Sequence, residues 1–349
     1  MIIIVDNGIK KFHEATRHLE GLDGLKFIYL DSEEITNNLI KDAEILFVRA
    51  TTKVNERLLK NTRIKLVGSA TAGSDHLNTK YLDEQKIKWF YSPGCNSSSV
   101  VHYVLSSVAF LVDNNLFSKD DSVGIFGCGH VGSKLRHALN ALQITNYAYD
   151  PFLNMNFLTS IEKVKNCKLV SMHVPLTDIG KFPTRNIIND DFLKDFKGKI
   201  LINSSRGEII DERALLESNE LLFIGDVWNN EPSPSKKVID FSLISTPHIA
   251  GHSCEGKING TVQLFYQLFK YLNLTAVKET SNKVILNDYF AINSIEDYPK
   301  ELRNYKDSFN IFRESEKFKK ACQGFQEDIP ARIFKKSRSG HVKRTDITP

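Results

Sequence analysis

Three residues, Arg206, Glu231 and His248, have the side-chain types that hydride chemistry at the α-carbon of a hydroxy acid requires. A guanidinium keeps its charge and binds a carboxylate and a developing carbonyl through paired hydrogen bonds. An imidazole titrates near neutral pH and can take the hydroxyl proton. A carboxylate beside it favours the protonated ring and fixes which nitrogen faces the substrate. We therefore expect a catalytic triad in which His248 is the acid/base.

Each member of the triad lies in a short, distinctive segment: residues 202–207 (INSSRG), 226–232 (DVWNNEP) and 246–251 (TPHIAG). Taken alone, Arg206 could form a surface ion pair, Glu231 could end a strand and His248 could be a core histidine. Their combination downstream of a nucleotide-binding turn favours the catalytic interpretation.

That turn is G-x-G-x-x-G at residues 127–132 (GCGHVG), between a strand-like run at 122–126 and a helical run from residue 133. The first glycine makes a tight turn and the second lets the backbone approach a pyrophosphate. The third allows the helix to pack closely on the strand, and the N-terminus of that helix offers N–H groups to phosphates. Candidate cofactor-binding residues are Gly127, Gly129, His130, Val131 and Gly132.

The acidic residue that usually accompanies such a turn is Asp150, which ends the strand predicted at 146–149, about eighteen residues after Gly132. A carboxylate there suits a ribose 2′-hydroxyl and repels a 2′-phosphate, so NAD is favoured over NADP. The alternative is that Asp150 is a turn residue before Pro151.

The remaining pattern alternates strand-like and helix-like runs, which predicts parallel sheets covered by helices. In the first part, strands are expected at 2–5, 26–30, 45–48, 65–67 and 88–91, and helices near 11–19, 54–59 and 79–85. A turn at 92–96 and a long helix at about 98–114 lead into a second part. Its strands are expected at 122–126, 146–149, 168–173, 199–203, 222–227 and 243–246. A helix at about 255–272 then carries the chain back to the first part.

The fold expected is therefore α/β with two doubly wound parallel-sheet domains: a flavodoxin-like substrate domain and an inserted Rossmann NAD domain. The substrate domain is discontinuous, over residues 1–96 and 255–284, and the NAD domain spans 97–254. Residues 285–349 are more polar and irregular, and we expect a small C-terminal extension that could serve in dimerisation.

Composition is that of an ordinary globular protein: 349 residues with 41% hydrophobic and 25% charged residues and a formal charge of +4. This charge is too small to argue for a nucleic-acid partner. The C-terminal basic residues favour a solvated or frayed tail: Arg332, Lys335, Lys336, Arg338, Lys343 and Arg344. Five cysteines without a C-x-x-C pair indicate reduced thiols in a cytoplasmic protein, with no metal site. No signal peptide or membrane span is expected.

With these motifs, the chain resembles the D-2-hydroxyacid dehydrogenase family, and within it a branch that oxidises a phosphorylated four-carbon hydroxy acid in vitamin B6 synthesis. The family supports the glycine turn, Asp150 and the triad. The narrower resemblance is carried by residues 48–55 (VRATTKVN), 69–76 (SATAGSDH), 93–96 (PGCN) and 255–257 (EGK). It runs from the N-terminus to about residue 272.

The resemblance implies that NAD is the cofactor, bound in a cleft between the domains, and that the protein is a homodimer. It implies that Arg206, Glu231 and His248 are catalytic and that Asp150 holds the adenosine ribose. It further implies that Val174, Asp226 and Gly251 line the NAD site and that Thr71 contacts the substrate. Two positions depart from the family: Ala50 stands where a substrate-contacting serine is usual, and His252 stands in place of a tyrosine.

The residues leave some alternatives open. Arg49, Lys53 and Thr71 could cradle a substrate phosphate, since Arg49 follows a predicted buried strand. Arg49 and Lys53 could instead pair with acids such as Glu56. His252 could replace the tyrosine as a hydrogen-bonding group or fill its space. At the level of function, the rivals are a dehydrogenase for another small acid and a non-catalytic NAD-sensing protein. The intact triad argues against the sensor.

Overall fold

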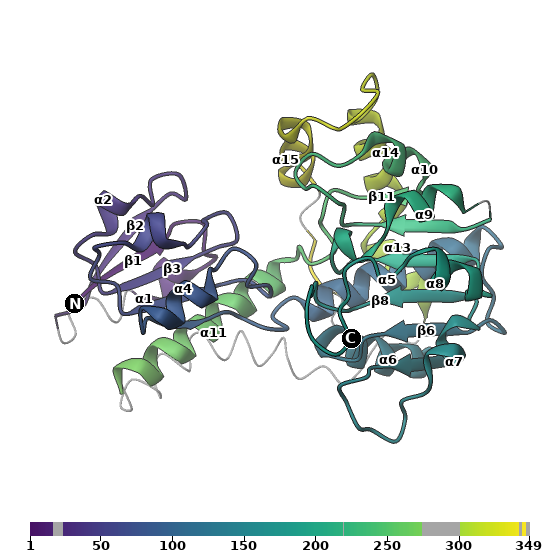
Figure 1. Ribbon diagram of the computed structural model, residues 1–349, viewed down its shortest axis with the longest axis horizontal. Coiled ribbons are helices and arrows are strands. Elements are labelled where there is room, and N and C mark those ends of the chain that lie inside the picture. The colour runs from purple at the N-terminus through teal and green to yellow at the C-terminus, as the bar shows by residue number, and fades with distance from the viewer. Residues whose placement is uncertain (17–23, 219, 274–300, 342–343, 347–349) are drawn as a thin grey trace. The chain divides into compact units, whose positions relative to one another are not determined.

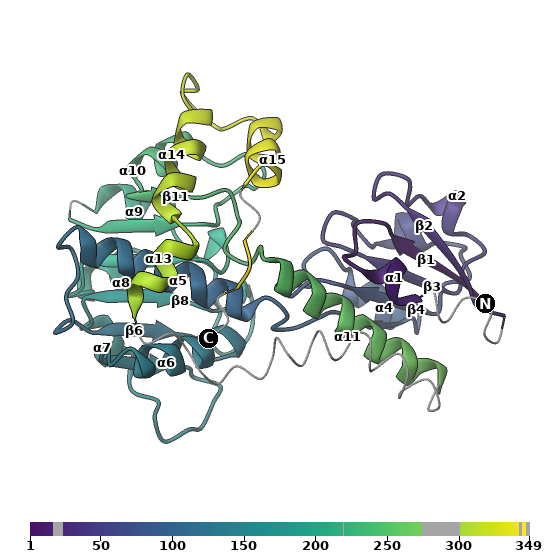
Figure 2. The same cartoon turned by 180° about the vertical axis from the view of Figure 1, so that it is seen from behind.

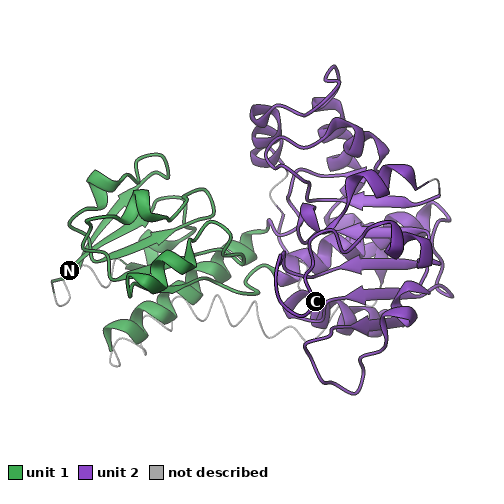
Figure 3. Cartoon of the chain, viewed as in Figure 1, with its two compact units in different colours: residues 1–96, 253–295 green, residues 97–252, 296–349 purple. Residues whose placement is uncertain are grey.

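The computed structural model describes residues 1–16, 24–218, 220–273, 301–341 and 344–346. The chain forms two compact units, one of residues 1–96 and 253–295 and the other of residues 97–252 and 296–349 (Figure 3). Parts of the predicted elements lie outside the described residues: 17–19 of the first helix, 274–284 of the substrate domain, and 285–300, 342–343 and 347–349 of the extension.

The first unit is built on a five-stranded parallel sheet in the order β2-β1-β3-β4-β5, which is the flavodoxin-like order that we expected (Figure 1). Its strands are β1 (Ile2–Asp6), β2 (Lys26–Leu30), β3 (Ile45–Val48), β4 (Leu66–Ser69) and β5 (Lys88–Phe90). Its helices are α1 (Phe12–Thr16), α2 (Asn37–Ile40), α3 (Glu56–Leu59), α4 (Thr79–Glu84) and α11 (Cys254–Leu272).

Both faces of this sheet are covered, which explains why its inner strands are hydrophobic without alternation. In β3, the side chain of Phe47 belongs to the core on the face of α1 and α11, and its neighbour Leu46 belongs to the core on the other face. On the first face Phe12 of α1 stacks on Phe265 of α11 with ring centroids 4.5 Å apart. Helix α11, which follows the second unit's strands in the sequence, is therefore an integral part of the first unit.

The second unit contains a six-stranded parallel sheet in the order β11-β10-β9-β8-β6-β7. Its strands are β6 (Val123–Phe126), β7 (Asn146–Tyr149), β8 (Leu169–Met172), β9 (Ile200–Asn203), β10 (Leu222–Gly225) and β11 (Ile244–Ser245). Beyond β7 an isolated parallel bridge joins Ala148 to Leu158. With that bridge in the place of a third strand, the order matches the dinucleotide-binding order 3-2-1-4-5-6, and β11 is added beyond the sixth position. The order reverses at β6, which places the crevice expected for a ligand outside the carboxyl end of that strand.

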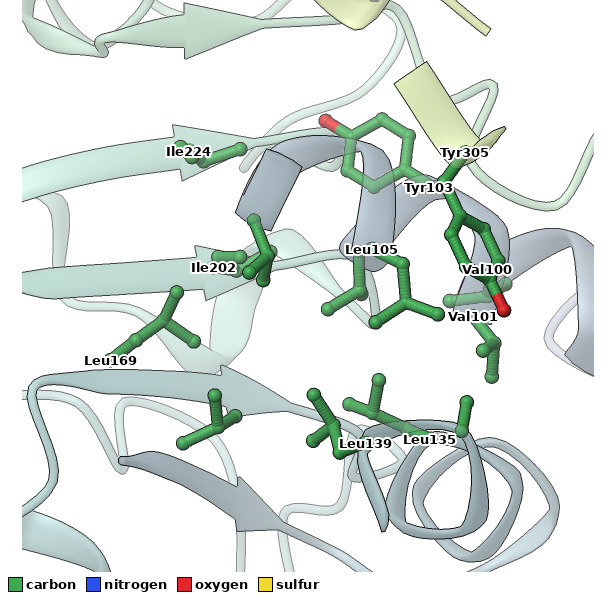
Figure 4. Packing of buried hydrophobic residues seen from close by; sticks show 14 of the residues in the cluster. Val100, Val101, Tyr103, Leu105, Leu135, Leu139, Leu169, Ile202, Ile224 and Tyr305 are labelled. Atoms are coloured by element: carbon green, nitrogen blue, oxygen red, sulfur yellow. The ribbon is translucent and has the colours of Figure 1, made fainter. Parts of the chain in front are cut away.

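The helices of the second unit cover both faces of its sheet: α5 (Ser97–Asp113), α6 (His130–Ala141), α7 (Ile161–Lys165), α8 (Asp190–Asp195), α9 (Glu212–Glu217) and α10 (Lys236–Phe241), with a 3₁₀ turn at Gly207–Ile209. Helix α5 is buried on nearly all sides, as its apolar sequence predicts. Figure 4 shows its side chains Val100, Val101 and Leu105 facing Leu135 and Leu139 of α6 and the strand residues Leu169, Ile202 and Ile224.

The C-terminal segment corrects one expectation, because its described part is helical where the sequence indicated irregular structure. It forms α13 (Leu302–Ser308), α14 (Ile311–Ala321) and α15 (Ala331–Ser339). Helices α13 and α14 pack beside α5, and α14 also contacts β11 (Figure 2). Buried Tyr305 and Ile311 share a core cluster with α5 and β11, whereas buried Phe318 packs on Phe334 of α15 in a second cluster. The apolar residues of α14 and α15 recur at helical spacing, but charged residues are frequent in both sequences, so the segment resembles a charged, irregular tail.

Candidate active site

The glycine turn has the backbone geometry that its sequence requires. Gly127 adopts φ +94°, and a Cβ there would lie 2.5 Å from the carbonyl oxygen of His173. A Cβ on Gly132 would lie 2.0 Å from the carbonyl oxygen of Gly127, so any side chain would push α6 away from the turn. The first and third glycines are therefore sterically necessary for this close approach of helix and strand.

The middle glycine is different, because no atom lies within 4 Å of the place where its Cβ would be. Gly129 is the N-cap of α6, and the first turn of the helix carries the exposed His130 and half-buried Val131. Open space beside the unpaired amides of a helix N-terminus fits a pyrophosphate. The turn therefore suits a dinucleotide at this edge of the sheet.

Asp150 follows β7 beside this turn. Its Oδ2 accepts from the N–H of Cys128 over 2.9 Å, and its Oδ1 accepts from the N–H of Phe152 over 3.0 Å. Each carboxylate oxygen has a second lone pair, so this turn-stabilising role leaves room for a ribose hydroxyl. The two interpretations of Asp150 are thus compatible with each other.

Residues after β8 complete this side of the site. The N–H of His173 donates to the carbonyl of Phe126 over 2.7 Å, and its Nε2 lies 3.0 Å from the hydroxyl of Ser171. Burial lowers the pKa of His173 to about 3, so the ring is neutral and structural. The next residue, Val174, is half-buried, and its Cγ1 lies 3.0 Å from the Cβ position built on Gly127. His173 thus shapes the loop that carries Val174.

The triad is carried by loops after three neighbouring strands. Arg206 follows β9, Glu231 follows β10 and His248 follows β11, and these strands are adjacent and parallel. Parallel strands end at the same edge of a sheet, so the three loops gather there. This is the edge at which ligands bind in open α/β sheets.

Glu231 and His248 are in direct contact. The Nδ1 atom of His248 lies 2.7 Å from Oε2 of Glu231, while Oε1 of Glu231 accepts from the N–H of Trp228 over 3.0 Å. Both side chains are partly accessible, at 33% for His248 and 21% for Glu231. Although burial opposes ionisation, the imidazole and these hydrogen bonds hold the pKa of Glu231 below its usual 4.5. The carboxylate thus fixes the ring so that Nε2 is the nitrogen left for a substrate.

Asp226 holds the segment that carries the histidine. Its Oδ1 accepts from the hydroxyl of Thr246 over 2.6 Å and from the N–H of Ile249 over 2.8 Å, and its Oδ2 accepts from the N–H of Ala250 over 2.8 Å. Burial raises the pKa of this carboxyl group. His248 has φ +56°, a left-handed conformation that is unfavourable for a residue with a side chain. The buried network around Asp226 maintains this conformation.

Arg206 is placed by the loop after β9. The side-chain amide of Asn203 donates to the carbonyl of Arg206 over 2.8 Å, and the half-buried guanidinium donates from Nη1 to the carbonyl of Ser205 over 2.8 Å. A Cβ on the next residue, Gly207, would lie 2.0 Å from the backbone carbon of Trp228. The loop of Arg206 therefore packs directly on the loop of Glu231, which explains the R-G pair.

In the first unit, the charge of Arg49 is already paired. Its guanidinium forms an ion pair with the buried carboxylate of Asp6 at 2.9 Å, and its Nη2 donates to the hydroxyl of Ser32 over 2.9 Å. Glu56, the partner considered from the sequence, instead pairs with Lys60 at 3.4 Å. Arg49 therefore forms an ion pair, as one of the two sequence-based interpretations predicted, but its partner is Asp6 and not Glu56.

The other two candidates of this unit lie after β3 and β4. Ala50 is exposed next to Arg49. The hydroxyl of Thr71 lies 2.7 Å from that of Ser69 and donates to the carbonyl of Gly73 over 3.0 Å. Ser69 in turn lies 2.8 Å from Nε2 of His76, whose pKa burial lowers to about 4. A hydrogen-bonded chain therefore orients Thr71.

The expectation of a solvated basic tail was wrong for two of its residues. Arg344 is buried, with 3% of its surface exposed, and it donates to the carbonyls of Ser99 and Ala250. Arg338 is half-buried, and its Nη2 lies 3.4 Å from Nε2 of His252. Arg332, Lys335 and Lys336 are exposed, as predicted, and Lys343 lies outside the described residues. The sequence did not predict either contact, because each one joins residues that are far apart along the chain.

All five cysteines are free thiols. Within the described ranges no three His, Cys, Asp or Glu side chains gather as a metal site. Of the helices in those ranges, none combines the length and hydropathy needed to cross a membrane.

The chain is similar to known proteins along much of its length. The family model described as "D-isomer specific 2-hydroxyacid dehydrogenase, NAD binding domain" matches residues 114–250. The erythronate-4-phosphate dehydrogenase of Wigglesworthia glossinidia brevipalpis is 38% identical over 282 residues, which cover 78% of this chain and 73% of that protein. The enzyme of the same name from Hahella chejuensis is 41% identical over 254 residues, or 70% of this chain and 67% of that protein.

Solved structures share the fold. The NAD⁺-bound 3-phosphoglycerate dehydrogenase of Entamoeba histolytica aligns with a TM-score of 0.67 at 24% identity, covering 80% of this chain and 97% of that one. The D-lactate dehydrogenase of Aquifex aeolicus, complexed with NAD and lactic acid, aligns with a TM-score of 0.62 at 20% identity, covering 78% and 96%. The glycine turn and the triad loops thus lie on an NAD-binding domain of this fold.

Proposed function

The chain belongs to the erythronate-4-phosphate dehydrogenases of the D-isomer specific 2-hydroxyacid dehydrogenase family, and we propose that it oxidises 4-phospho-D-erythronate with NAD. The product is (R)-3-hydroxy-2-oxo-4-phosphobutanoate, an intermediate on the way to pyridoxal 5′-phosphate. The observation that carries this proposal is the contact between His248 and Glu231 at the carboxyl edge of an NAD-binding sheet. A binding protein without turnover would have no need of a carboxylate-oriented imidazole there.

His248, Arg206 and Glu231 have separate roles in the proposed reaction. Bound NAD supplies the nicotinamide that accepts the hydride leaving C2. The Nε2 atom of His248 accepts the proton of the C2 hydroxyl, because Nδ1 is held by Glu231. Arg206 binds the substrate carboxylate and the developing carbonyl oxygen. Glu231 stabilises the imidazolium that forms, since the two groups favour each other's charged forms.

We assign cofactor binding to the turn and to the loops that surround it: Gly127, Gly129, His130, Val131, Gly132, Asp150, Val174, Asp226 and Gly251. The open space at Gly129 and the two remaining lone pairs of Asp150 support this assignment. We assign substrate contacts to Arg49, Ala50, Thr71 and His252. Family membership supports these last roles, together with a homodimer in the cytoplasm, which light scattering on the purified protein would test.

A comparison of substrates tests the proposal. We expect kcat/KM for NAD-dependent oxidation to be highest with 4-phospho-D-erythronate beside erythronate, 3-phosphoglycerate and D-lactate. Preference for another acid would keep the dehydrogenase chemistry and refute the substrate. NAD binding without turnover on any of them would favour the NAD-sensing alternative.

A further inference from the structure

Helix α15 is built onto the loop that carries Glu231. Residues 327–329 lie antiparallel to residues 234–236: the N–H of Lys236 donates to the carbonyl of Glu327, and that of Ile329 donates to the carbonyl of Pro234, each over 2.8 Å. Phe334 of α15 is buried and packs edge-to-face on Phe318, in the same core cluster as Trp228. The position of α15 is thereby fixed relative to the triad.

In its last turn, α15 presents Arg338 to the segment that follows the catalytic histidine. The Nη2 atom of Arg338 lies 3.4 Å from Nε2 of His252, and the ring of His341 lies 5.1 Å from that of His252. A guanidinium can only donate, so Nε2 of His252 accepts and its ring proton resides on Nδ1. His252 is therefore a neutral acceptor that orients the guanidinium.

Arg338 acts electrostatically on Glu231 without forming an ion pair with it. Within the part of the chain that the structure describes, no carboxylate forms an ion pair with Arg338, whereas Arg49 is paired with Asp6. Burial raises the pKa of Glu231, whereas the imidazole of His248, the N–H of Trp228 and, as the smallest contribution, the charge of Arg338 lower it. Its field thus reaches the catalytic pair. A half-buried guanidinium beside a reaction centre favours an anionic ligand.

We propose that Arg338 binds the distal phosphate of the substrate, with His252 as its positioning residue. The inference rests on the proposed function, which requires a carboxylate at one end of the substrate and a phosphate at the other. Arg206 takes the carboxylate, and a second guanidinium suits the phosphate at the other end of the substrate. Position 252 is usually a tyrosine in the family. In this chain the neutral histidine at that position holds Arg338 by accepting a hydrogen bond.

The kinetic test compares Arg338→Ala with Arg332→Ala, which removes the same charge from an exposed position on the same helix. We expect Arg338→Ala to lower kcat/KM for 4-phospho-D-erythronate roughly 10- to 100-fold, through KM more than kcat, and to lower that for unphosphorylated erythronate much less. Arg338→Lys keeps the charge but loses the paired hydrogen bonds, and should give a smaller loss. Arg332→Ala should match the wild type.

Equal losses on both substrates would overturn the proposal, because they would indicate a structural role. Loss of phosphate selectivity in Arg49→Ala but not in Arg338→Ala would also overturn it, and would assign the phosphate to Arg49.

A second readout does not depend on turnover. Inorganic phosphate should raise the thermal unfolding midpoint of the NAD-loaded wild type and of Arg332→Ala, and raise it much less in Arg338→Ala. If this pattern holds while 4-phospho-D-erythronate is not oxidised, the phosphate site stands and the proposed function fails. If oxidation occurs but phosphate protects all three proteins equally, the function stands and the role of Arg338 fails.

Discussion

The backbone N–H of His248 donates to the carbonyl oxygen of Asp226 over 2.8 Å, while the carboxylate of Asp226 accepts the amides of the two residues that follow His248. One buried side chain thus fixes the backbone on both sides of the proposed acid/base. The left-handed φ of +56° at His248 depends on this arrangement.

We therefore expect Asp226→Asn to lower both kcat and stability. An amide nitrogen in place of Oδ2 would face the N–H of Ala250, leaving a buried donor without an acceptor. The loss should be about 2–4 kcal/mol in the free energy of unfolding, measured by urea denaturation. Asp240→Asn, at an exposed position, is the matched control. Full stability and activity in Asp226→Asn would contradict this role.

Replacing Glu231 by Gln should change how the rate depends on pH. Without the carboxylate, the neutral imidazole is favoured, so the acid limb of kcat/KM for oxidation should move to lower pH. The loss of orientation should also lower kcat, by roughly 10²–10⁴-fold. Steady-state rates between pH 5 and 10 measure both effects, with the exposed Glu217→Gln as the control. An acid limb of kcat/KM at the same pH in Glu231→Gln and the wild type would rule out electrostatic coupling between Glu231 and His248.

The same pair gives a prediction for stability. The pKa of Glu231 is lower in the folded protein than its usual 4.5, so its contribution is present above that value. It should be lost as the pH falls through the folded pKa. The difference in unfolding free energy between the wild type and Glu231→Gln should therefore shrink below about pH 4.5. A difference that grows toward acid pH would have the wrong sign.

Two glycines of the turn should respond differently to alanine. Gly132→Ala places a Cβ 2.0 Å from a carbonyl oxygen, so the thermal midpoint should fall and NAD binding should be lost with it. Gly129→Ala meets no atom within 4 Å, so the fold should be kept while the Kd for NAD rises, by about 10-fold or more. Calorimetry measures both quantities. Unchanged NAD affinity in Gly129→Ala would show that the pyrophosphate does not bind beside Gly129.

The C-terminal segment should contribute to the catalytic loop. Arg344 stacks over the ring of Phe309 at 4.4 Å and donates to the carbonyl of Ala250, two residues after His248. Arg344→Ala leaves buried carbonyls without their donor and should cost about 2–4 kcal/mol of unfolding free energy. It should also lower kcat. Lys335→Ala at the surface is the control, and equal behaviour of the two variants would contradict the inference.

The sequence allowed the sheets to be predicted because their signals are local, and it placed the proposed triad after buried strands. Hydrophobic runs mark the buried strands, and Arg206, Glu231 and His248 each follow such a run at the edge where strand ends meet. The contacts of Arg338 and Arg344 were not predictable in this way. Each arises from tertiary packing: Arg338 lies in the charge-rich helix α15, and Arg344 lies beyond that helix, outside the described helices and strands. The partner of Arg49 was missed for a related reason: Asp6 is distant in sequence and is adjacent only because β1 pairs with β3.

Transfer of the C2 hydrogen to NAD is the central claim, and deuterium labelling tests it most directly. With 4-phospho-D-erythronate deuterated at C2, we expect mass spectrometry to find the label in NADH formed by the wild type and not by His248→Gln, whose NAD affinity should be unchanged. Bound NAD without labelled NADH from the wild type, or undiminished labelling by His248→Gln, would contradict the account.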